Sequence, residues 1–160
     1  MYLVEPSPEW PAAYARAVTQ LHSAYPGEIR FHHIGSTAVP GLIAKDCIDI
    51  LGLVSDLAEV GHARQRFETI GYEVRGAYGI EGREYFVRER PKVHLHCFQT
   101  GHRDALLHLH FVEVMRAEPA LVVELNALKR ALQAKYPNDK SRYQADKQIF
   151  YDRIHLRWRP

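Results

Sequence analysis

The sequence is poor in cysteine and contains no long apolar run. Its 160 residues include two cysteines, Cys47 and Cys97, and neither belongs to a Cys-x-x-Cys pair. Each lies in an apolar run that predicts a buried strand, so we expect reduced thiols and no disulfide framework. Nowhere do about 18 apolar residues follow one another, so no segment has the pattern of a membrane-spanning helix.

An excess of charge of either sign is also lacking. Lys and Arg number 21 and Asp and Glu number 19, which gives a formal net charge of +2 at pH 7 with neutral histidines. This balance gives little reason to expect a nucleic-acid partner, so any anion site must be local. The N-terminal MYLVEPSPEW has an acid and prolines where a signal peptide has basic and then apolar residues. We expect a cytoplasmic protein without membrane association, and the oligomeric state stays open.

The hydrophobic periodicity changes from two residues to about 3.6 near residue 102. Before that point the pattern predicts helices at 8–25 and 56–70, the second capped by Ser55, and strands at 29–34, 47–54, 72–78, 84–88 and 93–99. After it we expect helices at 103–116, 119–136 and 139–157. No linker-like tract divides the chain, so we predict one α+β domain over residues 1–160, with a mixed sheet of about five strands, flanking helices and a helical C-terminal tail.

The most informative stretch is HHIGSTAVPGLIAKDCIDI, residues 32–50, which predicts a strand, two turns and a strand that carries an acid. Gly35 permits close backbone approach, and the hydroxyls of Ser36 and Thr37 can donate to phosphate oxygens. Asp49 on the next strand could hold a cation opposite the turn. That arrangement suits a nucleotide with its metal. The alternative is an ordinary turn after a strand.

Asp49 lies between Ile48 and Ile50 in an otherwise apolar run. An unpaired carboxylate there would cost several kcal/mol, so Asp49 needs a partner. A metal ion, Lys45 or a backbone donor could supply one, and a hydrogen-bonded structural acid is the alternative. Asp46, three residues away, points to the opposite face of an extended strand.

Histidines provide a second candidate feature. His94 and His96 are two residues apart on a predicted strand and therefore project from one face. Paired imidazoles on one face suit a metal or phosphate site, and a half-exposed polar face is the alternative. His102, His108 and His110 follow no helical metal-ligand spacing except a weak i, i+2, so we interpret them as surface or interhelix residues.

Four separated strings carry a resemblance to a known family. They are VEPSPEWP at 4–11, IGSTAVPGLIAK followed by CIDILGLV within 34–54, VHLHCF at 93–98, and Tyr143-x-x-x-Lys147. In this order they resemble the signature of the GrpB family over nearly the whole chain. The resemblance implies a nucleotidyltransferase-like fold and leaves the activity unsettled.

The same resemblance assigns residues to a ligand. The phosphate- or nucleotide-binding residues that it implies are Gly35, Ser36, Thr37, Arg116, Tyr143 and Lys147. Tyr143 could stack on a base or bond a phosphate, and Lys147 could lend its charge to a triphosphate. A solvated basic helix face is the alternative for the last three. Because members of the family occur fused to dephospho-CoA kinase, the expected ligand is a nucleotide or a CoA-like phosphorylated small molecule.

The resemblance also implies a divalent cation, Mg²⁺ or another. Its ligands would be Asp49, His94 and His96, with Asp49 as the catalytic ligand. Active nucleotidyltransferases usually carry two acids two residues apart on this strand, whereas Cys47 and Leu51 flank Asp49 at that spacing. We therefore expect ligand binding with weak or specialised nucleotidyl transfer. An active metal-dependent nucleotidyltransferase that uses an unknown small acceptor is the alternative, and the sequence leaves open whether the protein is an enzyme.

Overall fold

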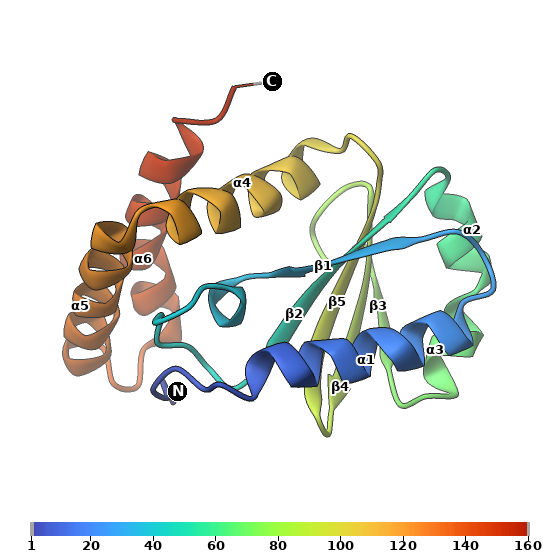
Figure 1. Ribbon diagram of the computed structural model, residues 1–160, viewed down its shortest axis with the longest axis horizontal. Coiled ribbons are helices and arrows are strands. Elements are labelled where there is room, and N and C mark those ends of the chain that lie inside the picture. Colours follow the sequence, from blue (N-terminus) through green and yellow to red (C-terminus); the bar gives the residue numbers. More distant parts are fainter. Residues whose placement is uncertain (1, 160) are drawn as a thin grey trace.

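A computed structural model describes residues 2–159 and contains a mixed five-stranded sheet (Figure 1). The strands, in their order across the sheet, are β1 (Arg30–Ile34), β2 (Ile48–Val54), β5 (Lys92–Gln99), β4 (Arg83–Glu89) and β3 (Glu73–Gly76). The β2–β5 pair is parallel, and the other neighbouring pairs are antiparallel. The predicted α+β class with its mixed sheet is confirmed.

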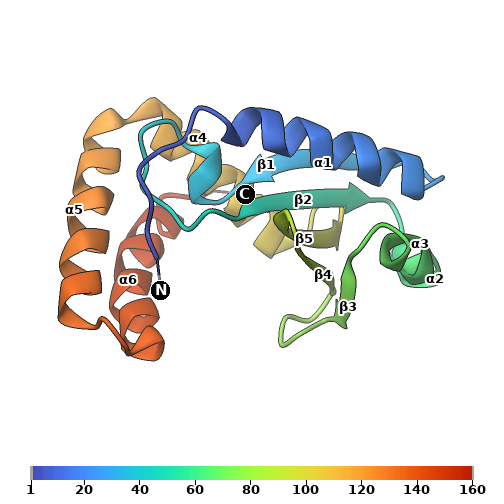
Figure 2. The same ribbon diagram turned by 90° about the horizontal axis from the view of Figure 1, so that it is seen from below.

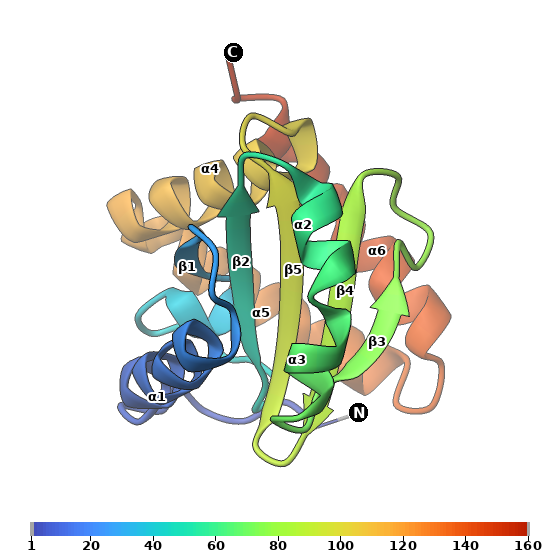
Figure 3. The same cartoon turned by 90° about the vertical axis from the view of Figure 1, so that its right-hand side faces the viewer.

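Helices cover both faces of the sheet. They are α1 (Trp10–Ala24), α2 (Leu57–His62), α3 (Arg64–Glu68), α4 (Arg103–Ala117), α5 (Pro119–Lys135) and α6 (Lys140–His155), with a 3-10 turn, η1, at Ser36–Ala38. Figures 2 and 3 show α1, α2 and α3 on one face and the helical tail, α4 to α6, on the other side of the sheet. Within residues 2–159, no helix is both long and apolar enough to cross a membrane.

The predicted helix at 56–70 is wrong as a single element. It is divided into α2 and α3 at Ala63, whose φ of −97° and ψ of 5° leave the helical region. Ser55 is not its cap either, because the Asp56 side chain accepts the hydrogen bond from the Ala58 backbone N–H at 3.0 Å. The other predicted elements are present, with ends displaced by a few residues.

Strand alternation sorts the side chains of β2 between two apolar clusters. Ile48 and Ile50 belong to the cluster formed with α1 and the α2–α3 segment. Leu51 belongs to the second cluster, formed mainly with the helical tail. Asp49 has the same parity as Leu51 and therefore faces the tail. Any site built around Asp49 must lie between the sheet and the helical tail.

Candidate functional site

Three segments meet beside the first residues of β2. Parallel pairing places the Cα of Asp49 opposite that of His94 on β5, and antiparallel pairing places Ile34 of β1 opposite Asp49. The Gly35-Ser36 turn follows Ile34 directly. Backbone pairing therefore brings the turn, the acid and the histidine strand together.

Asp49 has one hydrogen-bond partner on β5, His96, and a second histidine of that strand, His94, lies nearby. Its Oδ1 lies 3.2 Å from Nε2 of His96 and 3.7 Å from Nδ1 of His94. Burial raises the pKa of the Asp49 carboxyl, but the His96 hydrogen bond and the nearby histidines outweigh that effect, so this pKa lies below its ordinary value. Asp49 is therefore ionised at neutral pH, and 31% of its side chain remains exposed.

Arg83 fixes the tautomer of His96. Arg83 Nη1 lies 3.3 Å from His96 Nδ1, and since a guanidinium can only donate, Nδ1 accepts and the ring proton lies on Nε2. His96 then donates from Nε2 to Asp49 Oδ1. Arg83 is held in turn by the backbone oxygens of Ala77 and Tyr78. His96 thus holds the Asp49 carboxylate in position through this hydrogen bond. The assignment of His96 as a metal ligand, which the family resemblance implied, stays a prediction.

Lys129 of α5 reaches the glycine-serine turn from the helical tail. Its Nζ donates to Ser36 Oγ over 2.7 Å and to the backbone oxygen of Ile43 over 2.8 Å, and the residue is 2% exposed. Burial, with smaller contributions from Lys147 and Lys45, lowers the pKa of Lys129 to about 7. Its charge is thus nearly balanced between two protonation states at neutral pH, and a bound anion would favour the charged one.

A pocket of about 300 Å³ lies between the glycine-serine turn, the start of β2 and α6. We call it the lysine pocket. Its wall includes Ser36, Thr37, Lys45, Cys47, Asp49, His94, Lys129, Lys140, Tyr143 and Lys147. The structure therefore brings most of the residues that the sequence singled out to one cavity, although their roles stay predictions.

Tyr143 and Lys147 of α6 line the lysine pocket side by side. The Lys147 Nζ lies 5.5 Å from the centroid of the Tyr143 ring, and burial lowers the pKa of Lys147 to about 8. Tyr143 is only 1% exposed, which leaves no ring face for a base. Its buried hydroxyl has no hydrogen-bond partner within residues 2–159. Both roles considered for Tyr143 stay predictions, and the unpartnered hydroxyl leaves one hydrogen-bond donor unused.

Asp49 also borders a second cavity, of about 360 Å³, which we call the apolar hollow. Its wall includes Ile34, Gly35, Ile80, His96, Leu107, His108, Phe111 and Tyr151. Burial lowers the pKa of His108 to about 4, and its ring centroid lies 5.6 Å from that of His96. The interpretation of His108 as a surface or interhelix residue missed this position. Asp49 thus lies between a lysine-rich and a mainly apolar cavity.

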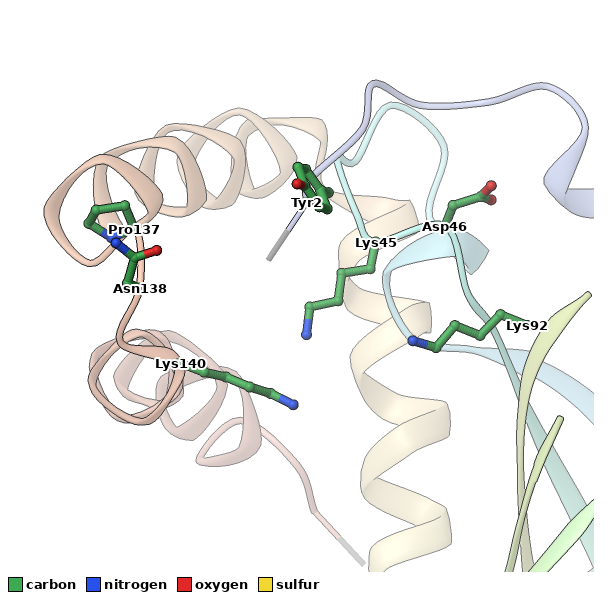
Figure 4. A pocket seen from close by; sticks show the side chains of 7 residues that line it. All are labelled: Tyr2, Lys45, Asp46, Lys92, Pro137, Asn138 and Lys140. Carbon is green, nitrogen blue, oxygen red and sulfur yellow. The ribbon is translucent and has the colours of Figure 1, made fainter. Parts of the chain in front are cut away.

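A third hollow, which we call the outer hollow, has a volume of about 560 Å³ and shares Lys45 and Lys140 with the lysine pocket (Figure 4). Lys92 points into it from a third segment. Asp46 also borders this hollow, but its carboxylate points away and accepts a 2.9 Å hydrogen bond from Trp10 Nε1. None of the three lysines forms a salt bridge with a carboxylate of residues 2–159. The outer hollow therefore extends the positive charge of the lysine pocket.

Arg116 is not brought to the lysine pocket. It lines a different hollow together with Tyr14 and His33, and its Nε donates to the backbone oxygen of Ala38 at 3.0 Å. Thr37 does line the lysine pocket, but its Oγ1 is already 2.9 Å from His33 Nε2. Arg116 therefore contacts the segment after the glycine-serine turn from outside the lysine pocket, whereas the family resemblance gave it a role in binding a phosphate or nucleotide.

The residues around Asp49 do not fit a magnesium site of paired acids. Two residues from Asp49 the chain offers the thiol of Cys47, just before β2, and the apolar Leu51 on β2, and the neighbouring strand β5 offers His94. Among the described residues that line the lysine pocket, Asp49 is the single carboxylate. Mg²⁺ prefers near-octahedral coordination by oxygen. The donor set therefore does not suit Mg²⁺, which is one of the divalent cations that the family resemblance allows.

Sequence comparison identifies a family. The model described as GrpB protein matches residues 1–157. The UPF0157 protein YqkA of Bacillus subtilis is 35% identical over 120 residues, which cover 74% of this chain and 35% of that relative's length. The glutamate-rich protein GrpB of Alkalihalophilus pseudofirmus is 30% identical over 160 residues, covering 95% of this chain and 92% of that protein. A dephospho-CoA kinase of Mycolicibacterium paratuberculosis is 42% identical over 74 residues, which cover 44% of this chain and 18% of the kinase.

Comparison with solved structures supports the fold. The crystal structure of the conserved protein GrpB from Enterococcus faecalis has a TM-score of 0.87 at 28% identity and covers 97% of this chain and 98% of its own. The Cid1 poly(U) polymerase, in a structure bound to MgATP, has a TM-score of 0.59 at 10% identity, and the match covers 85% of this chain and 46% of the polymerase chain. The second likeness shows the fold alone. Together they confirm the predicted nucleotidyltransferase-like architecture.

The first prediction tests how closely the turn packs on Asp49. Gly35 has a φ of +73°, and an added Cβ would lie 2.9 Å from Asp49 Oδ2. We expect Gly35→Ala to lower the free energy of unfolding by about 1–3 kcal/mol through backbone strain. Displacement of the Asp49 carboxylate should add a further loss of stability. Gly79→Ala is the matched control, because Gly79 has a φ of +83° and no atom within 4 Å of an added Cβ. Urea denaturation measures both losses, and equal losses would contradict the close packing.

Proposed function

This chain belongs to the GrpB family and has a nucleotidyltransferase-like fold, and from that premise we propose that it binds a nucleotide or another phosphorylated small molecule in the lysine pocket. The supporting observation is the group of lysine side chains that line this pocket, two of which are largely buried. Burial lowers the pKa of Lys129 to about 7 and that of Lys147 to about 8. Lys45 and Lys140 line the same wall, where Asp49 is the single carboxylate among the described residues.

Clustered ammonium groups are unfavourable unless an anion compensates them. The proximity of Lys147 and Lys45 contributes to the lowered pKa of Lys129. A phosphate group would reverse this effect, because a nearby opposite charge favours the charged form and charge-assisted hydrogen bonds are strong. The unpartnered hydroxyl of Tyr143 offers a further donor. Ammonium and hydroxyl donors are the groups that phosphate oxygens accept from.

The apolar hollow suits the organic part of such a ligand. Its volume of about 360 Å³ falls in the range of small-molecule sites, and rings of Phe111 and Tyr151 contribute to its wall. A ligand that passes Asp49 would place phosphates among the lysines and a base or pantetheine-like group in this hollow. The local likeness to a dephospho-CoA kinase supports including CoA-like molecules among the candidates.

Metal-dependent nucleotidyl transfer to a small acceptor is the second candidate function. The fold likeness to the Cid1 poly(U) polymerase favours it, as does the position of Asp49 between two cavities. Transfer in enzymes with two metal ions relies on several carboxylates. Among the described residues that line the lysine pocket, Asp49 provides the single carboxylate. We therefore prefer binding as the function, with transfer slow or specialised.

The second prediction tests the phosphate site by removing one charge. We expect Lys147→Met to weaken binding of ATP and of inorganic triphosphate at least about tenfold, because a charge-assisted contact is lost while the side chain keeps a similar length. Lys135→Met is the matched control, since Lys135 is exposed and pairs with Asp146 instead of lining the pocket. Isothermal titration calorimetry compares the three chains. Equal affinity in all three, or no binding by the parent chain, would refute the proposal.

The third prediction concerns pH. Triphosphate affinity should fall as the pH rises through about 7 to about 8, because Lys129 and then Lys147 lose their protons and the pocket loses positive charge. A bound phosphate raises both pKa values and moves the fall to higher pH. Calorimetry at a series of pH values measures the affinity profile. The Lys147→Met variant binds the same titrating triphosphate and therefore serves as the control, and its affinity should fall less steeply with pH. An affinity that is constant or rises across this range would contradict the charge assignment.

A further inference from the structure

Cys47, Asp49 and His94 present three potential ligand atoms to one point. The Cys47 Sγ, a carboxylate oxygen of Asp49 and a ring nitrogen of His94 all lie within 4.8 Å of one another. Cys47 immediately precedes β2, Asp49 lies on β2, and His94 is the Cα partner of Asp49 on β5. The sheet ladder therefore fixes the backbone at Asp49 and His94, and Cys47 directly adjoins the first paired residue, Ile48.

We propose that these three residues bind a divalent transition-metal ion of the zinc type. Thiolate, imidazole and carboxylate are the ligands that tetrahedral zinc sites use. Ligand atoms around such an ion lie roughly 3 to 4 Å apart, so groups within 4.8 Å of one another need only small side-chain rotations. Mg²⁺ selects oxygen ligands in near-octahedral geometry, and this set contains one carboxylate, one thiol and one imidazole.

The surroundings distinguish Cys47 from a thiol that only fills space. Cys97, the other thiol, is fully buried in the apolar cluster on the α1 side of the sheet. Cys47 instead lines the lysine pocket beside Asp49 and His94. His96 donates to Asp49 Oδ1 and so holds the carboxylate in position, as hydrogen-bonding partners of metal ligands commonly do.

Three protein ligands leave one position of a tetrahedral ion open. Because Cys47, Asp49 and His94 all line the lysine pocket, that position opens toward its lysines. Water or a phosphate oxygen could occupy it. The inference goes beyond the proposed function and does not rest on it, since an ion could bind these residues in the absence of any phosphorylated ligand.

The fourth prediction tests the ion without nucleotide. Metal-free full chain is titrated in a calorimeter with Zn²⁺ and, separately, with Mg²⁺. We expect one Zn²⁺ per chain, with an affinity at least about 100-fold above that for Mg²⁺. Titration with Co²⁺ should produce a thiolate-to-metal charge-transfer band, which reports coordination by a cysteine. The absence of one-to-one Zn²⁺ binding, or a cobalt spectrum without that band, would overturn the proposal.

Three substitutions locate the ion. Cys47→Ser should lower the Zn²⁺ affinity at least about tenfold and remove the cobalt band, whereas Cys97→Ser should preserve both. Cys47→Asp makes the donor set richer in oxygen and should shift its preference toward Mn²⁺ and Mg²⁺. Circular dichroism verifies folding, and if Cys47→Ser does not fold, the cobalt spectra of the parent and Cys97→Ser decide. Equal Zn²⁺ affinity in the folded parent and Cys47→Ser would assign the ion elsewhere and refute the proposal. Triphosphate binding measured without metal tests the proposed function separately.

Discussion

The site depends on one constraint, which is that an ionised carboxylate within a largely buried strand must find compensating partners. Asp49 finds them because the parallel pairing of β2 with β5 sets His94 opposite it and brings His96 within 3.2 Å. A slip of one residue would turn Asp49 toward the apolar cluster under α1, where the uncompensated charge would cost several kcal/mol. The register of the central strands and the polar contact therefore enforce each other.

The helical tail supplies the opposite charge. Its helices pack on the Leu51 face of the sheet through the second apolar cluster, and that packing carries Lys129 and Lys147 to the glycine-serine turn. Lys129 then ties the turn to α5 through Ser36. Apolar packing thus sets carboxylate, imidazole and ammonium groups around one small cavity. Such a cavity suits a ligand that carries phosphate, and its thiol and imidazole side suits a soft cation.

Local sequence patterns predicted what depends on local geometry. Residues two apart on a strand share a face, so the meeting of Asp49 with His94 and His96 followed once the two strands were neighbours. The break at Ala63 carried no such signal, because no proline stands there and a helical pattern tolerates an isolated glycine nearby. The burial of Lys129 could not be predicted either, since it depends on how the tail docks far along the chain. The periodicity of a single segment does not predict such long-range packing.

A crystal structure with a non-hydrolysable ATP analogue tests most directly whether a phosphate chain lies beside Asp49 in the lysine pocket. We predict phosphate oxygens within hydrogen-bond distance of Lys147 Nζ and the Tyr143 hydroxyl, with the base directed into the apolar hollow. Phosphates bound outside the lysine pocket, for example at Arg116, would contradict it.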